Sequence, residues 1–316
     1  MSSWATADPG ATCKHAAMLD PLATNRVVVL DGGMGTELEA RGARMDHEGW
    51  SALANLEEPL LVREIHEDYI RAGADVVIAN TFPANRTALA AAGFGDRVEE
   101  ANRAAVTAAL EARERAGRPV AVAGSMSLWG PHDRLRAQEA PPEEHLLEVY
   151  GEQAAILADA GVDLIVLEMF DARWAAALRP ARETGLPVWL GLWAEPGRDG
   201  RLRAPTGRPF EDDLPAVIDD GVAAVVVMHS PLDAVGPALE AVARHWDGPR
   251  GAYPHAGHFE RPHWIFKELA PSVMADHAAA WVRDGARIVG GCCGTRPEHI
   301  RAISDRLAAG DAPVRA

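Results

Sequence analysis

The sequence is short of basic residues and of cysteine. It contains 31 Lys and Arg residues against 46 Asp and Glu, which gives a formal net charge of −15 at pH 7. This acidic balance disfavours binding to nucleic acid and to anionic membrane surfaces. Three cysteines in 316 residues are too few for a disulfide framework, and neighbours such as Cys292 and Cys293 rarely pair with each other. We therefore first expect an enzyme that acts on small molecules.

Long hydrophobic runs are also absent. No segment approaches the roughly 18 apolar residues that a membrane helix needs, and residues 1–25 lack the basic and apolar segments of a signal peptide. We expect a cytoplasmic protein with an irregular N-terminal extension over residues 1–25, where Cys13 is a free thiol. A single folded domain is expected over residues 26–316.

The rest of the chain alternates short β-branched runs with helical stretches. The runs are 26–33, 74–82, 119–126, 162–170, 187–194, 223–230, 248–257 and 286–294, of which the seventh, rich in Gly and Pro, is the weakest. Helical segments such as 57–73 and 141–161 separate them and end at a glycine. Eight such units predict an α/β fold, a (β/α)8 TIM barrel. A doubly wound sheet is the alternative, although no G-x-G-x-x-G turn follows the first run.

Each run becomes polar or aromatic at its carboxyl end. In a TIM barrel these ends form one rim, which carries the active site, so we expect their side chains to lie close together. A single residue there could simply bind its own loop, but eight such ends favour a shared site. The residues are Asp31, Asn80, Thr81, Ser125, Glu168, Trp193, His229, Tyr253, His255, Cys292 and Cys293.

The adjacent cysteines indicate a metal site. A barrel can add a third ligand from another strand, and His229 is the best candidate on this rim. Two thiolates and one imidazole are a normal catalytic Zn²⁺ set, which leaves a fourth position for water or substrate. The residues alone leave a second reading open, in which Cys292 and Cys293 are buried structural thiols.

Several segments resemble the zinc-dependent homocysteine S-methyltransferase family. The similarity covers nearly the whole chain after residue 26, and TELEARG and HEDYIRAGAD are most similar to the branch that uses S-methylmethionine. The resemblance implies a (β/α)8 barrel with zinc held by three cysteines, of which Cys292 and Cys293 match two. The segments are LDGGMGTELEARG (30–42), WSALANLEEPLLVREIHEDYIRAGADVVIANTF (50–82), VAGS (122–125), LIVLEMF (164–170) and GGCCGTRPEHI (290–300).

The resemblance also implies roles in substrate binding. Asp31 and Glu168 match the carboxylates that orient the amino acid in the family. The residues implied to line the pocket are Gly32, Gly33, Thr81 and Ser125.

The chain departs from the family pattern around this pocket. The sixth run reads VVVMHSPLD where the family usually has Asn-Cys, so either Met228 or His229 takes the place of the third cysteine. We prefer His229, because a thioether is a poor zinc ligand. Other departures are SMSLWGP (125–131), His255 in place of an asparagine, and the histidine- and aromatic-rich segment 255–264.

Together these features predict methyl transfer from an onium donor, such as S-methylmethionine, to the thiol of homocysteine or a related thiol or selenol. Aromatic rings at the rim could face the donor cation, although packing explains each of them as well; the candidates are Trp129, Trp193, Tyr253 and Trp264.

Three alternatives stay open: a zinc hydrolase or lyase on the same barrel, a methyltransferase with a different thiol acceptor, and a non-catalytic binding protein. His258 and His263 could supply a ligand if His229 does not. Six further histidines are expected to lie on the surface: His47, His66, His132, His145, His245 and His277.

Overall fold

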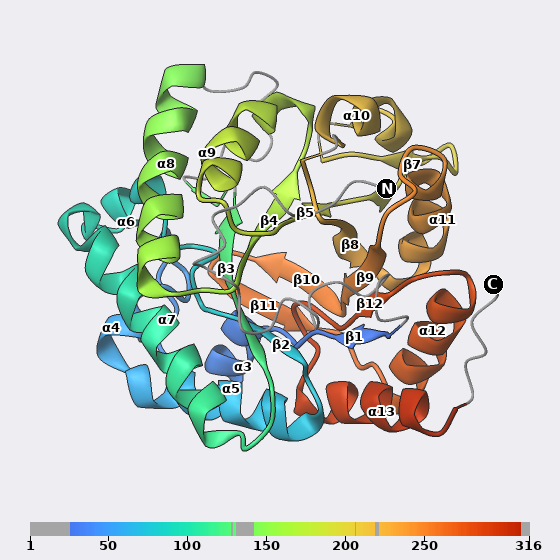
Figure 1. Cartoon of the computed structure of the whole chain (residues 1–316), viewed down its shortest axis with the longest axis horizontal. Helices are drawn as coiled ribbons and strands as arrows, with labels where there is room; N and C mark the ends of the chain where they lie inside the picture. Colours follow the sequence, from blue (N-terminus) through green and yellow to red (C-terminus); the bar gives the residue numbers. More distant parts are fainter. Residues whose placement is uncertain (1–25, 128, 131–141, 206, 219–220, 311–316) are drawn as a thin grey trace.

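Eight parallel strands form a closed barrel in the computed structural model, which describes residues 26–127, 129–130, 142–205, 207–218 and 221–310 (Figure 1). Cys13 and His132 therefore lie outside the described residues. The strands follow the order β1-β12-β9-β8-β5-β4-β3-β2, and a parallel bridge between Leu30 and Val76 joins β1 to β2. The strands are β1 (Val28–Val29), β2 (Val76–Ile78), β3 (Ala121–Ser127), β4 (Leu164–Phe170), β5 (Val188–Leu192), β8 (Ala224–Pro231), β9 (Arg250–His255) and β12 (Ile288–Val289).

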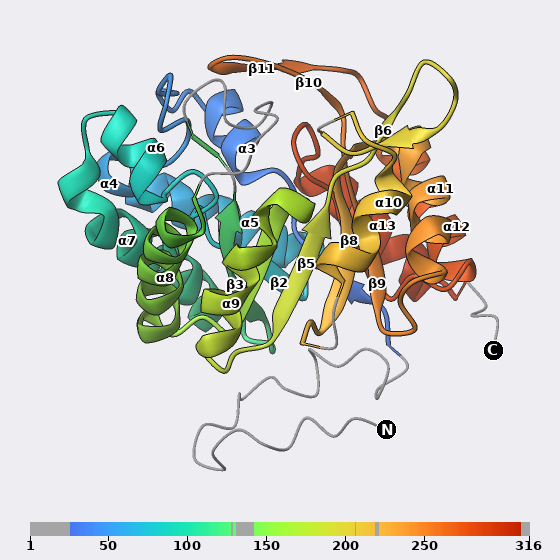
Figure 2. The ribbon, with the colours of Figure 1, turned by 90° about the horizontal axis from the view of Figure 1, so that it is seen from above.

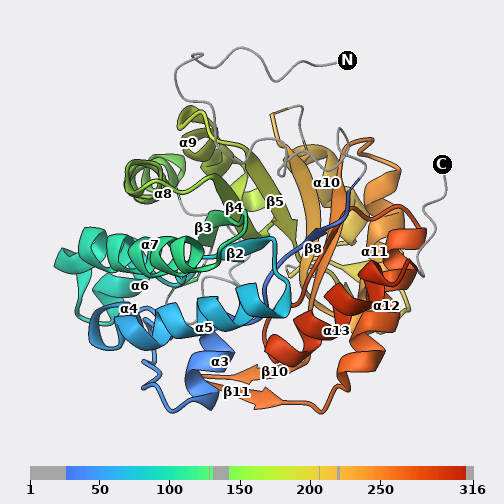
Figure 3. The same ribbon diagram turned by 60° about the horizontal axis from the view of Figure 1, so that its bottom comes forward.

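Each of the eight strands falls inside one of the eight predicted runs or extends one residue past it, so the predicted barrel is confirmed and the open sheet is excluded. Helices surround the barrel (Figure 3). The larger ones are α5 (Pro59–Ala72), α7 (Val98–Arg115), α8 (Glu143–Ala160), α10 (Phe210–Val217), α11 (Leu232–Ala243), α12 (Pro271–Arg283) and α13 (Pro297–Ala308). Shorter ones are α3 (Met34–Ala40), α4 (Ala54–Glu57), α6 (Arg86–Ala91), α9 (Leu178–Glu183) and the 3₁₀ helices η1 (Gly95–Arg97) and η2 (Ala172–Ala177).

Local signals explain where the helices begin and end. Pro59 occupies the first turn of α5, where its missing N–H costs nothing. Gly73 and Gly161 end α5 and α8 in the left-handed conformation, with φ of 112° and 93°. None of the described helices combines the length and the low charge needed to cross a bilayer.

Alternate residues of the strands pack into two layers. Val28 and Leu30 point into the barrel with Trp189 and Met228, whereas Val29 packs outward against the helices. This alternation follows from the two-residue period of a strand. The interior is thus filled by side chains, and space for a ligand remains at the rim.

Two antiparallel hairpins add to the C-terminal end of the barrel. They are β6 (Glu195–Pro196) with β7 (Leu202–Arg203), and β10 (Gly257–Glu260) with β11 (His263–Phe266). Figure 2 shows the β10–β11 hairpin lying across the same end of the barrel as α3. Glu39 of α3 binds the hairpin, because its carboxylate contacts Nδ1 of His263 at 2.8 Å and the backbone N–H of Trp264 at 3.0 Å.

Candidate metal centre

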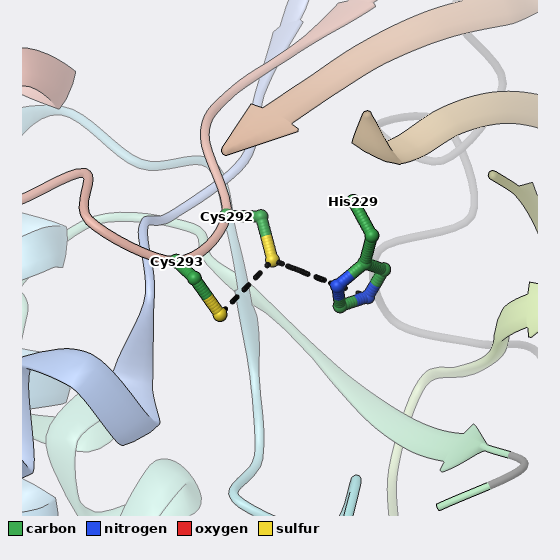
Figure 4. A group of neighbouring side chains, drawn as sticks. All are labelled: His229, Cys292 and Cys293. Atoms are coloured by element: carbon green, nitrogen blue, oxygen red, sulfur yellow. Dashed lines mark hydrogen bonds between the residues drawn. The ribbon is translucent and has the colours of Figure 1, made fainter. Parts of the chain in front are cut away.

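Two cysteines and a histidine converge at the C-terminal end of the barrel. Cys292 and Cys293 follow β12, whereas His229 lies in β8, and β9 separates these two strands. The Cys292 sulfur lies 3.2 Å from Nδ1 of His229 and 3.7 Å from the Cys293 sulfur. Figure 4 shows the Cys292 sulfur between the Cys293 sulfur and the His229 ring. Both cysteines are buried, and His229 exposes 11% of its side chain.

Two of the three separations between these ligand atoms fit a zinc ion, and all three atoms lie within 4.8 Å of one another. In a tetrahedral site, Zn–S bonds of about 2.3 Å and Zn–N bonds of about 2.0 Å place two sulfurs about 3.8 Å apart and a sulfur and a nitrogen about 3.5 Å apart. The observed separations of 3.7 and 3.2 Å are close to those values. Among the described residues, no other group of three His, Cys, Asp or Glu side chains brings its ligand atoms this close.

An irregularity in β8 turns His229 toward the cysteines. The register between β8 and β9 shifts between Met228 and Pro231, and His229 has a φ of +49°, which is unusual for a residue other than glycine. The preceding Met228 is fully buried inside the barrel. Of the two residues that could replace the third cysteine, His229 is therefore the one that faces Cys292.

A hydrogen-bonded chain continues from His229 into the barrel wall. Oε2 of Glu168 lies 2.7 Å from Nε2 of His229, and Oε1 of Glu168 accepts a 2.5 Å hydrogen bond from the Ser125 hydroxyl. Thr81 holds the Ser125 backbone, donating to its carbonyl at 2.8 Å and accepting from its N–H at 2.9 Å. Thr81 and Ser125 are fully buried, so they stand behind the site.

Asp31 lies at the seam between β1 and β2. Its carboxylate accepts a 2.8 Å hydrogen bond from the backbone N–H of Ile78 and a 3.3 Å hydrogen bond from the Tyr253 hydroxyl. Burial raises its pKa well above the usual value. Because Asp31 is completely buried, Gly32 and Gly33 present the backbone of this turn to the site instead.

A small pocket at the rim of the barrel adjoins the candidate ligands. Trp50 and Phe82, which were not among the predicted site residues, form an aromatic wall of this pocket. The Phe82 ring lies 5.3 Å from the His229 ring, and Trp50 lies 6.1 Å from Phe82. Both residues lie within a segment that carries the family resemblance, but only the fold shows that they face the site. The pocket residues are Gly32, Gly33, Met34, Gly35, Trp50, Ile78, Ala79, Asn80, Phe82, Glu168, His229, Tyr253, Cys292 and Cys293.

Two of the other aromatic candidates, Trp264 and Trp129, make contacts outside the pocket. The Trp264 indole donates to the carbonyl of Ala256 at 2.9 Å. The guanidinium of Arg261 lies 4.6 Å from the Trp129 ring, so a cation already covers one face of it. Only Tyr253 of the four predicted rings belongs to the pocket wall.

The two extra histidines of segment 255–264 lie away from the candidate ligands. The side chains of His258 and His263 are 63% and 62% exposed and contact Glu260 and Glu39 at 2.9 and 2.8 Å. They belong to the β10–β11 hairpin. Neither joins the group of His229 and the cysteines.

Protons and a metal ion compete for this centre. Burial lowers the pKa of His229, but Cys292 and Glu168 outweigh burial and raise it to about 10. Burial raises the pKa of Cys292 well above its usual value, although His229 opposes the change. A metal ion that binds these residues must displace their protons, so its affinity depends on pH.

Comparison with known proteins decides the family. The family model described as homocysteine S-methyltransferase matches residues 28–307. The chain belongs to the homocysteine S-methyltransferase family. The family predicted from the sequence motifs is thus confirmed, and so is the assignment of the chain as a methyltransferase-like enzyme.

Individual members of the homocysteine S-methyltransferase family resemble the chain over most of its length. Homocysteine S-methyltransferase YbgG of Bacillus subtilis (strain 168) is 30% identical over 309 residues, which cover 90% of this chain and 95% of the relative. A selenocysteine methyltransferase of Astragalus bisulcatus is 28% identical over 340 residues and is covered to 99%, against 94% of this chain. The metallated form of the Escherichia coli homocysteine methyltransferase MmuM has a TM-score of 0.74 and 27% identity, with 92% of this chain and 99% of that chain covered.

Proposed function

We propose that this protein is a zinc-dependent methyltransferase that moves a methyl group from an onium donor, such as S-methylmethionine, to the thiol of homocysteine or a related thiol or selenol. The observation that carries the proposal is the approach of His229, Cys292 and Cys293 to one another beside a pocket. Homocysteine and selenocysteine methyltransferases among the relatives support this class of acceptor. A metallated relative supports the metal.

Zinc held by His229, Cys292 and Cys293 would stabilise the thiolate form of the acceptor at neutral pH. The chain itself would position the reactants. Gly32 and Gly33 offer backbone groups in the pocket wall for the amino-acid part of the acceptor, and the rings of Trp50 and Phe82, which also line the pocket, would keep water away from it. Alignment of the acceptor sulfur, the methyl carbon and the leaving group would supply much of the rate, because displacement at carbon requires a collinear arrangement.

Three of the remaining predicted substrate residues, Asp31, Thr81 and Ser125, do not line the pocket and would act by positioning the groups that do. Asp31 fixes the turn that carries Gly32 and Gly33 through its bond to Ile78. Ser125 and Thr81 fix the position of the Glu168 carboxylate. A cationic donor suits the aromatic rings of Trp50, Phe82 and Tyr253, whose faces attract onium groups.

The test is metal analysis and a methyl-transfer assay on wild type, His229→Ala and Cys292→Ala, with homocysteine and S-methylmethionine as substrates. We expect about one zinc per wild-type chain, and loss of most zinc and of methyl transfer in both variants. His258→Ala removes an exposed histidine and should keep both properties. Equal zinc and activity in all four proteins would refute the assignment.

Two further results would favour the alternatives. Zinc-dependent hydrolysis of esters or amides without methyl transfer would indicate a hydrolase on the same barrel. A metal-free protein after purification with a reductant would indicate a binding protein without this chemistry.

A further inference from the structure

Both oxygens of the Glu168 carboxylate contact protein groups. One oxygen lies 2.7 Å from Nε2 of His229, and the other accepts the 2.5 Å hydrogen bond from Ser125. Glu168 is only 4% exposed, and His229 is 11% exposed at its side chain. The contact is therefore a buried one that solvent screens weakly.

This contact determines which nitrogen of His229 is free to bind a metal. A carboxylate accepts hydrogen bonds and cannot donate, so Nε2 must carry the proton in the bond to Glu168. The lone pair of a neutral imidazole is then on Nδ1, the nitrogen that lies 3.2 Å from the Cys292 sulfur. Metal-binding histidines commonly donate their second N–H to a carboxylate in this way, which fixes both the tautomer and the plane of the ring.

The contact also changes the negative charge that the site offers to a metal ion. Replacing a third cysteine thiolate by a neutral imidazole removes one negative charge from the ligand set. A carboxylate hydrogen-bonded to the far side of the imidazole returns a negative charge to the centre and increases the basicity of the ligand. Glu168 and His229 together thus offer the metal a charge similar to that of one cysteine.

Both partners lie at irregular points of their strands. Met169, directly after Glu168, has a φ of +62°, and His229 has a φ of +49°. The β4–β5 register shifts between Leu167 and Phe170, much as the β8–β9 register shifts near His229. Such conformations are strained and persist where the surrounding structure holds them. The irregularities bring together side chains from two strands that β5 separates.

We infer that Glu168 is a positioning residue for the metal ligand His229, that Ser125 holds Glu168 in place, and that the Glu168–His229 pair takes the place of a third cysteine. This is a different task from orienting the substrate ammonium, which the family resemblance implies for Glu168. The inference rests on the proposed function only in requiring that the centre binds a metal ion.

The experiment measures metal affinity in the absence of substrates. Zn²⁺ dissociation constants are obtained by competition with a chromophoric chelator for wild type, Glu168→Gln, Glu168→Ala and Ser125→Ala. We expect a 10- to 100-fold weaker affinity for Glu168→Ala, and smaller losses for the other two variants. Co²⁺-loaded protein gives a second readout, because a reoriented imidazole changes the visible absorption bands of the bound ion.

The effect of Glu168→Ala is also measured in a His229→Cys background. A thiolate has no second N–H to offer Glu168, so Glu168→Ala should lower Zn²⁺ affinity several-fold less in His229→Cys than in wild type. This double-mutant cycle isolates the coupling between the two positions from any general damage to the fold. Asp75→Asn serves as the control for loss of a buried carboxylate, because Asp75 lies outside the site and contacts Arg26 and the backbone N–H of Val29. We expect it to leave Zn²⁺ affinity within about threefold of wild type.

Three results would overturn the inference. Unchanged Zn²⁺ affinity in Glu168→Ala, together with a raised KM for the amino-acid thiol, would make Glu168 a substrate residue. An equal loss of affinity from Glu168→Ala in the wild-type and His229→Cys backgrounds would show that Glu168 does not act through His229. An equal loss in Asp75→Asn would show a general effect of removing a buried negative charge. Failure of wild type to bind Zn²⁺ would instead refute the proposed function itself.

Discussion

His66 shows how a single residue can be misjudged from its type. We expected a surface histidine, but His66 is fully buried, and neither ring nitrogen has a hydrogen-bond partner among the described residues. Its position explains this. Val62, Ile65, Tyr69 and Ile70 of α5 are also buried, and a spacing of three and four residues places all of them on one helix face with His66. The position of His66 on the apolar face of the helix therefore determines its burial, in spite of the polarity of the imidazole.

Burial of His66 predicts a loss of stability in acid. Desolvation lowers its pKa from 6.5 to about 3. The unfolded chain therefore binds a proton below pH 6.5 that the folded chain does not, and the free energy of unfolding falls as the pH drops from 6.5 toward 3. The largest slope from this one residue is about 1.4 kcal/mol per pH unit.

His66→Leu should remove this slope. We expect equal or greater stability at pH 8, because the variant also removes unpaired buried polar atoms, and a shallower loss of stability between pH 6.5 and 5. Urea denaturation at several pH values measures this. His258→Gln, at an exposed position, should follow wild type. A His66→Leu protein that loses stability with pH as steeply as wild type would contradict the assignment.

The candidate site was predictable in part. Strand ends identified Asp31, Glu168, His229, Cys292 and Cys293 as members of one rim, because a barrel places all such ends together. The bond between Glu168 and His229 was not predictable. It depends on two irregular strand positions, and no local sequence pattern predicts their positive φ values.

At the scale of elements, the turn after β1 and the loop after β12 pack directly against each other. A Cβ on Gly33 would lie 2.5 Å from the Thr36 hydroxyl, 2.8 Å from the carbonyl oxygen of Cys292 and 3.0 Å from Cα of Cys293. Gly33 has an ordinary φ of −71°, so its lack of a side chain, and not its backbone freedom, is what the structure requires. This contact therefore helps to fix the position of the loop that carries Cys292 and Cys293.

Gly33→Ala should therefore weaken metal binding as well as the fold. Relief of the clash must move the backbone of Cys292, and such overpacking costs about 1 to 3 kcal/mol. Zn²⁺ titration and thermal unfolding measure the two effects. Gly151→Ala is a matched control, because nothing lies within 4 Å of its added Cβ, and alanine favours its helix by up to about 1 kcal/mol. An unaffected Gly33→Ala protein would show that the cysteine loop is not held by this contact.

The eight strands were easier to predict than the hairpins. Continuous β-branched runs between amphipathic helices specify a barrel almost by themselves. The β10–β11 hairpin carries mixed polar and aromatic residues, and its position depends on Glu39, more than 200 residues away in the chain. A contact over that distance leaves no local signal in the sequence.

For the whole molecule, a metal ion would join distant parts of the barrel. His229 and Cys292 are separated by 63 residues, and β9 lies between their strands. An ion that binds only the folded chain stabilises it by about 4 kcal/mol when the free ion exceeds its dissociation constant a thousandfold. We expect the thermal midpoint to rise when Zn²⁺ is added to chelator-treated wild type. The same addition to Cys292→Ala should leave the midpoint nearly unchanged, and an equal rise would place the stabilising ion elsewhere.

X-ray absorption at the zinc edge of the purified protein, without substrate, is the strictest test of the proposed metal centre. We predict a first shell with two sulfur ligands at about 2.3 Å and at least one imidazole nitrogen at about 2.0 Å. In His229→Ala the imidazole contribution should disappear while both sulfurs remain in any zinc that still binds. A shell of oxygen and nitrogen alone, or an unchanged imidazole signal in His229→Ala, would contradict a centre built from His229, Cys292 and Cys293.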